Sequence, residues 1–106
     1  MHRELRFTHT ADKQLSDIEN NHALTGILKQ VRKTLGYLET NLRSKSLQTH
    51  KHNLLSSRYK REIFEAYVQQ NTSGAYRVFW HYGDDEVDKN GKRVSVITVV
   101  HIGPHP

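Results

Sequence analysis

Arginine and histidine side chains able to handle phosphate occur in two segments of the chain. Arg77 lies within the run AYRVFWHY, and His105 is the next-to-last residue; the His50–Lys51–His52 tripeptide lies earlier. A guanidinium is permanently charged and its planar fork matches phosphate oxygens, whereas imidazole gives or takes a proton near neutral pH. These residue types favour a phosphate-handling site. A core with polar residues at its edge is the alternative, and the residues alone leave both open.

A second group of candidate residues lies on or beside the strands expected in the C-terminal half. Glu65 and Tyr67 share one face of a strand because side chains alternate along it, so a carboxylate base or a base-stacking ring is possible there. His81 and His101 fall within the two strands of a predicted C-terminal hairpin. Ordinary packing or ion pairing, including an Arg77–Glu65 pair between strands, is the alternative.

The charge of the chain indicates an anionic partner. Sixteen Lys and Arg oppose eleven Asp and Glu, which leaves a net charge of +5. A basic balance favours nucleic acid, an anionic protein or an acidic small substrate. Basic residues gather in the middle third, and the candidates for phosphate binding there are His50, Lys51, Arg58, Lys60 and Arg61.

Several classes of protein are not expected. The chain has no cysteine, which removes disulfides and thiolate metal sites, and no apolar run approaches the roughly 20 residues of a membrane helix. The histidines show no i, i+4 pair on a clear helix, and the Glu86–Gly91 segment lacks the first and last ligands of a calcium loop. We therefore expect a cytoplasmic protein with no metal, no small-molecule cofactor and no membrane partner.

The hydrophobic pattern predicts one α+β domain over residues 1–106. Thr10 is a plausible N-cap for a first helix, and a second helix carries a leucine-rich stripe. Residues 43–61 lack periodicity and are interpreted as a surface loop with at most a single turn of structure. The expected order is a strand at 5–9, helices at 10–19 and 24–42, and strands at 63–70, 76–82 and 94–102. Two helices would then pack on a mainly antiparallel four-stranded sheet.

This order of elements and four short motifs resemble the RelE/ParE superfamily of toxins from type II toxin–antitoxin systems, in its RelE and YafQ-like branch. The resemblance covers essentially the whole chain. The motifs are Phe7, Ala11, Lys13 and Leu15; Tyr76–Phe79; the ending Gly103, Pro104 and His105; and His52–Leu55 before the sheet.

The resemblance implies cleavage of messenger RNA, usually on the ribosome, by acid–base chemistry without a metal. Arg77 would stabilise the phosphorane, and His105 and His52 would act as the acid and base, with the exact residue within 50–52 left open. A cognate antitoxin protein would cover the basic cleft. Relatives of the RelE type carry lysines on the strand at 63–70, and this chain has none there, which shifts the expected chemistry to histidines.

Two other functions stay open at this point. The ParE branch shares the fold and inhibits DNA gyrase by binding, without nuclease activity. A non-toxic relative that retains only the fold and acts as an interaction protein is the third possibility, and the acidic turn at residues 84–88, unusual for a ribosome-binding protein, keeps it open.

Overall fold

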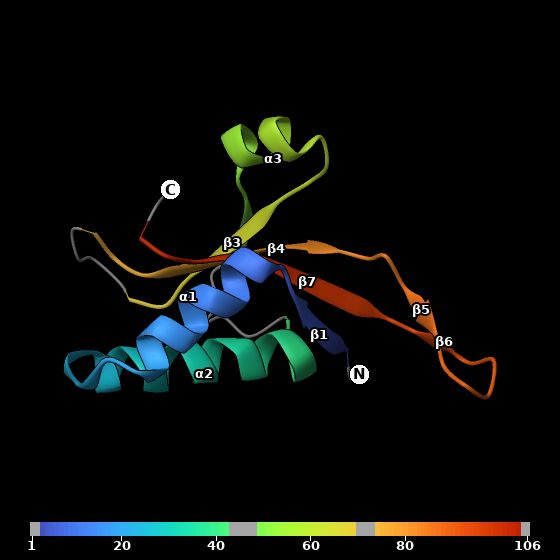
Figure 1. The fold of residues 1–106 in the computed structure, drawn as a ribbon. Coiled ribbons are helices and arrows are strands. Elements are labelled where there is room, and N and C mark those ends of the chain that lie inside the picture. Colours follow the sequence, from blue (N-terminus) through green and yellow to red (C-terminus); the bar gives the residue numbers. More distant parts are fainter. Residues whose placement is uncertain (1–2, 43–48, 70–73, 105–106) are drawn as a thin grey trace.

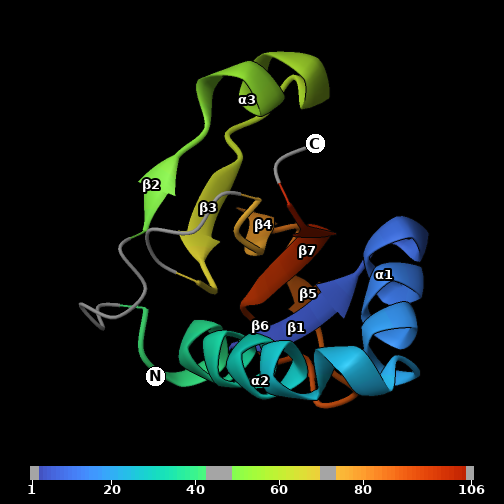
Figure 2. The same cartoon turned by 90° about the vertical axis from the view of Figure 1, so that its left-hand side faces the viewer.

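The computed structural model describes residues 3–42, 49–69 and 74–104. A five-stranded sheet separates two layers of helix (Figures 1 and 2). Helices α1 (His9–Glu19) and α2 (Thr25–Thr40) cover one face, and the short helix α3 (Asn53–Tyr59) stands on the other side. The predicted α+β class is therefore confirmed.

The order of strands in the sheet is β1-β7-β4-β3-β2. Strand β1 (Glu4–Phe7) runs parallel to β7 (Val96–Gly103), and the other three pairings are antiparallel. The remaining members are β2 (His50–Lys51), β3 (Phe64–Tyr67) and β4 (Arg77–Tyr82). The prediction of four strands is wrong by one, because β2 forms within the segment interpreted as a loop.

Alternating side chains of β4 supply both sides of the core. Val78 and Trp80 pack with Ala11, Val31 and Leu38 of the helical layer, whereas Phe79 packs with Leu55, Ile63 and Val100 under α3. Trp80 and Phe79 are fully buried. Burying a large apolar side chain contributes about 1.5–3 kcal/mol, so this one strand ties the two layers together.

Helix α1 begins earlier than predicted. The N-cap is Thr8, whose Oγ accepts a hydrogen bond from the Ala11 N–H at 3.2 Å, and Thr10 lies inside the helix. The strand at 5–9 is correspondingly shorter and ends at Phe7. Thr8 and Thr10, two residues apart, offer the same capping chemistry, and the end of the β1–β7 pairing decides between them. A 3₁₀ turn, η1 (His22–Leu24), then leads into α2.

The described part of the predicted loop, residues 49–61, is ordered by polar contacts within it and with Ile63. The His52 ring caps α3, and the Ser56 hydroxyl accepts a hydrogen bond from the Ile63 N–H at 2.8 Å. Leu55 of this helix is buried, and Lys60, which caps the end of the helix, has the left-handed conformation (φ 56°). Histidine is an uncommon cap and the helix is short, so the hydrophobic pattern gives little sign of it. Residues 43–48 of the predicted loop lie outside the described residues.

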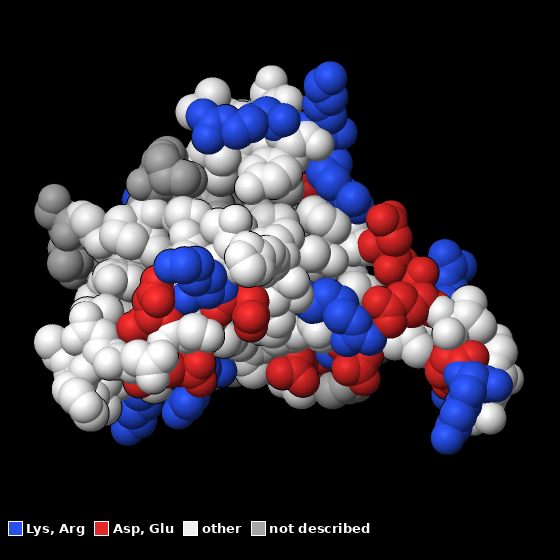
Figure 3. All heavy atoms as spheres, in the orientation of Figure 1, with Lys and Arg blue, Asp and Glu red and all other residues white. Residues whose placement is uncertain are grey.

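A two-stranded arm projects from the sheet between β4 and β7 (Figure 1). It consists of β5 (Glu86–Val87) and β6 (Arg93–Val94), joined by the predicted turn with Gly91 at φ 77°. The Glu86 carboxylate accepts two hydrogen bonds from the Arg6 guanidinium, at 2.7 and 3.1 Å, so the arm is tied to β1. Acidic and basic side chains both lie along this arm, and Lys and Arg also gather around α3 (Figure 3).

Candidate active site

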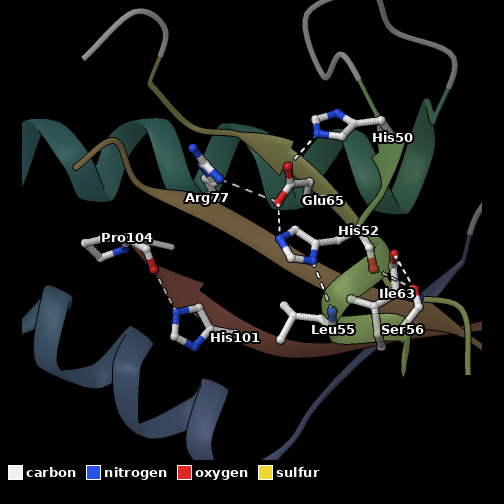
Figure 4. A network of polar contacts seen from close by, with 9 residues as sticks. All are labelled: His50, His52, Leu55, Ser56, Ile63, Glu65, Arg77, His101 and Pro104. Atoms are coloured by element: carbon white, nitrogen blue, oxygen red, sulfur yellow. Dashed lines mark hydrogen bonds and ion pairs between the residues drawn. The ribbon is translucent and has the colours of Figure 1, made fainter. Parts of the chain in front are cut away.

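Four polar side chains converge on the α3 side of the sheet (Figure 4). At the centre is Glu65 on β3. Its Oε1 lies 2.5 Å from His50 Nε2, and its Oε2 lies 3.8 Å from Arg77 Nη1 and 3.9 Å from His52 Nε2. We call these four residues the Glu65 cluster. Three strands and the start of α3 contribute to it.

The register of the sheet brings these residues together. His50 on β2 lies opposite Glu65 on β3, and Arg77 on β4 lies opposite Tyr67 on β3. Glu65 and Tyr67 are two residues apart and point to the same face, so Arg77 reaches Glu65 diagonally. The guanidinium carbon of Arg77 lies 4.6 Å from the centre of the Tyr67 ring, within range of a cation–π interaction.

Burial of Glu65 gives the cluster its electrostatic character. Its side chain is only 4% exposed, and a carboxylate removed from water needs positive or hydrogen-bonding partners. Among the described residues, Glu65 Oε2 and Arg77 Nε are buried with no hydrogen-bond partner. The cluster is held together by charge, and part of its hydrogen-bonding capacity is unused.

His50 is the exposed histidine of the cluster. Its side chain is 45% exposed, and its Nε2 is directed at the Glu65 carboxylate. The ring also lies against Tyr67, with centroids 5.6 Å apart. A carboxylate bound to one imidazole nitrogen orients the ring and stabilises it after it takes up a proton. His50 therefore has the arrangement of a general base.

His52 is placed differently. Its side chain is 12% exposed, and its Nδ1 accepts the hydrogen bond of the Leu55 N–H at 3.1 Å. In the neutral ring the proton is consequently on Nε2, the atom facing Glu65. The ring edge also packs on Phe79. Through these contacts His52 caps α3 and lies against the cluster.

His101 lies outside the cluster. Its ring packs edge-on against Phe79 at a centroid distance of 5.4 Å. His52 contacts the same phenyl ring. Figure 4 shows it directed toward Pro104 on the side nearer α1. It also lines a hollow of about 420 Å³ between α1 and the end of β7. The remaining residues lining this hollow are Gln14, Asp17, Ile18, Asn21, Leu24, Tyr76, Ile102, Gly103 and Pro104.

The predicted phosphate-binding residues of the middle third lie on and around α3. Arg58 and Lys60 are exposed. Lys51 is 3.5 Å from Glu62, and Arg61 donates a hydrogen bond to the Tyr82 carbonyl at 2.8 Å. We call these cations on and around α3 the positive margin, and Lys and Arg side chains are visible around α3 in Figure 3. The predicted catalytic residue His105 lies outside the described residues.

His81 lies at the other end of β4 and titrates below its ordinary range. Burial lowers the pKa of His81, and the positive charge of Arg61 lowers it further; the Tyr82 carbonyl and Asp84 act in the opposite direction. The folded protein therefore favours the neutral ring. The unfolded chain binds more protons than the folded one below about pH 6.5, so this residue makes stability fall as the pH is lowered through that value.

The His81→Gln substitution tests this contribution. We expect the variant to lose less unfolding free energy than the wild type between pH 7.5 and pH 5, because the ring that resists protonation is gone. Urea denaturation at the two pH values measures the difference. If the variant loses as much unfolding free energy as the wild type between pH 7.5 and pH 5, or more, the assignment to His81 is wrong.

Sequence reasoning missed the His50–Glu65 contact. The alternation of His50 and His52 around Lys51 was available as a signal for a short strand. Two residues are too few for a hydrophobic pattern, so the pairing with β3 became evident only in the folded chain.

Comparison with known protein families, curated proteins and solved structures finds no match in any of the three. Within residues 3–42, 49–69 and 74–104, no group of three or more His, Cys, Asp or Glu side chains is arranged to hold a metal ion. In the same residues no helix combines the length and the apolar character needed to cross a bilayer.

Proposed function

We propose that this protein is a RelE-like toxin that cleaves messenger RNA by acid–base chemistry of its own side chains. One observation carries the proposal. A histidine whose side chain is 45% exposed, His50, and an arginine, Arg77, both contact the same buried carboxylate, Glu65. Attack of a ribose 2′-hydroxyl on the adjacent phosphate requires a base and a fixed cation, and here both are bound to one carboxylate.

In the proposed reaction His50 takes the proton of a ribose 2′-hydroxyl. The oxygen attacks the adjacent phosphorus, and the bond from phosphorus to the 5′-oxygen of the next nucleotide breaks. The products are a 2′,3′-cyclic phosphate and a 5′-hydroxyl, whose oxygen receives a proton from the acid. Arg77 stabilises the additional negative charge on the phosphorane. We assign the role of acid to His105, which the sequence resemblance implies to be an acid or a base.

Assigning the base to His50 refines the expectation from the sequence. The choice within residues 50–52 was left open, with His52 favoured. His52 is nearly buried and its Nδ1 is engaged by the backbone of α3, whereas His50 is half exposed and bound to Glu65. Exposure and orientation both support His50.

The positive margin supports RNA as the substrate. Arg58 and Lys60 on α3, together with Lys51 and Arg61, would contact phosphates along the strand without reading its sequence. The proposed partners are therefore messenger RNA, the ribosome that presents it in the cytoplasm, and an antitoxin that covers this surface.

The His50→Ala substitution tests the proposed base. We expect it to lower the initial rate of RNA cleavage by about 10²–10⁴-fold, the usual contribution of a positioned base. Added imidazole should restore part of the rate, because a free base then occupies the vacated space. The assay follows end-labelled RNA, free and bound to ribosomes.

His22→Ala is the matched control, since His22 is exposed on η1, away from the cluster. This variant should cleave at the wild-type rate. Equal rates for His50→Ala and the wild type would exclude His50 as the base.

A further inference from the structure

A chain of three hydrogen bonds joins α1 to the end of β7. The Gln14 Oε1 accepts the Ile102 N–H at 2.8 Å, and its Nε2 lies 3.0 Å from His101 Nδ1. On the other side of the ring, His101 Nε2 lies 3.0 Å from the Pro104 carbonyl oxygen. Elements 88 residues apart in sequence are linked through one side-chain amide.

These contacts determine where the proton of His101 resides. A backbone N–H only donates, so the oxygen of the Gln14 amide faces Ile102 and its NH₂ group faces His101. The Nδ1 of His101 must then accept. A carbonyl oxygen only accepts, so Nε2 must carry the proton that binds Pro104. Both ends of the chain independently require the same neutral tautomer, with hydrogen on Nε2.

The hydrogen bonds of His101 with Gln14 and Pro104 lie next to β4, the strand that carries Arg77. Gly103, between His101 and Pro104, is the register partner of Arg77 in the β4–β7 pairing. Gly103 has φ 154°, which favours glycine, and a Cβ there would lie 3.5 Å from His101 Nε2. The ring, the glycine and the carbonyl form one compact turn beside Arg77.

We propose that Gln14 is a positioning residue that locks His101 in the Nε2–H tautomer and so holds the chain at Gly103–Pro104 beside Arg77. His101 is then a structural clamp, and both of its nitrogens are committed to the protein. The effect on RNA cleavage rests on the proposed function. The tautomer itself does not, and it can be measured separately.

The Gln14→Glu substitution tests the clamp in the full chain. The new carboxylate accepts from both neighbours, so His101 must place a proton on Nδ1 instead of accepting there. We expect ¹⁵N NMR of the histidine rings at pH 8 to show His101 as the Nε2–H tautomer in the wild type and as an Nδ1-protonated ring in Gln14→Glu. The kcat for RNA cleavage should fall at least tenfold with KM nearly unchanged. Displacing the groups of the site weakens their stabilisation of the transition state more than it weakens binding of the substrate.

Gln30→Glu is the matched control, since Gln30 is exposed on α2; it should change neither the His101 spectrum nor the rate. Gln14→Met, which keeps the length but removes the donor, serves as a second variant if Gln14→Glu does not fold. It should also lower kcat at least tenfold.

An unchanged His101 tautomer in Gln14→Glu would overturn the clamp, and a changed tautomer with unchanged kcat would overturn the positioning role. A wild type without nuclease activity would refute the proposed function, while the ring spectra would still decide the clamp.

Discussion

Arg77→Ala is expected to lower RNA cleavage by about 10²–10³-fold, the usual cost of removing one fixed donor at a developing negative charge. The guanidinium is held over Tyr67 and near Glu65, so it needs no rearrangement when the phosphorane forms. Single-turnover cleavage of end-labelled RNA measures the loss. In cells, induction of the wild type should arrest growth and Arg77→Ala should not.

Two further substitutions isolate the role of this arginine. Arg77→Lys keeps the charge but loses the planar fork, so we expect an intermediate rate. Arg93→Ala removes an arginine that is 81% exposed on the arm, and it should leave the rate unchanged. If Arg77→Ala cleaves RNA as fast as the wild type while remaining folded, Arg77 has no part in the reaction.

Glu65→Ala is expected to destabilise the protein by about 3 kcal/mol, because it leaves the partly buried cation of Arg77 without its carboxylate. The same substitution removes a hydrogen-bond partner of His50. Each kcal/mol corresponds to roughly 4–8 °C in a domain of this size, so the melting temperature should fall by more than 10 °C. Thermal unfolding followed by circular dichroism gives the shift.

Glu62→Ala is the control for this prediction, since Glu62 is 68% exposed and its ion pair with Lys51 is worth about 0–1 kcal/mol. The double variant Glu65→Ala/Arg77→Ala should be more stable than the sum of the two single losses predicts, because neither charge is then left alone. A melting temperature for Glu65→Ala close to that of Glu62→Ala would show that the carboxylate does not hold the cluster.

Sequence patterns predicted the large elements of the fold because those elements bury apolar stripes. The leucine-rich stripe of α2 and the alternation of β4 each have a period that only one kind of secondary structure satisfies. The same reasoning failed between residues 49 and 61. Helix α3 depends on a histidine cap, and β2 on its pairing with β3, and neither contact leaves a hydrophobic period in the sequence.

The candidate site was predictable in its residue types more than in its geometry. Arg77, Glu65 and Tyr67 could be placed on neighbouring strand faces from alternation alone. The different roles of His50 and His52 could not be predicted from the sequence. They depend on which ring is buried and on which ring nitrogen accepts the hydrogen bond from the backbone of α3. No feature of the sequence singles out Gln14, because a glutamine on the surface of a helix is common and its role depends on β7 packing beside it.

The most direct test of the Glu65 cluster as a nuclease site is an analysis of the RNA ends that the purified wild type produces. An RNA and a copy with a single 2′-deoxyribose at the cleavage position are compared in buffer containing EDTA, free and bound to ribosomes. Cleavage of the RNA alone, giving a 2′,3′-cyclic phosphate and a 5′-hydroxyl, is the predicted result. Absence of cleavage under both conditions, or equal cleavage of the deoxy-substituted copy, would contradict it.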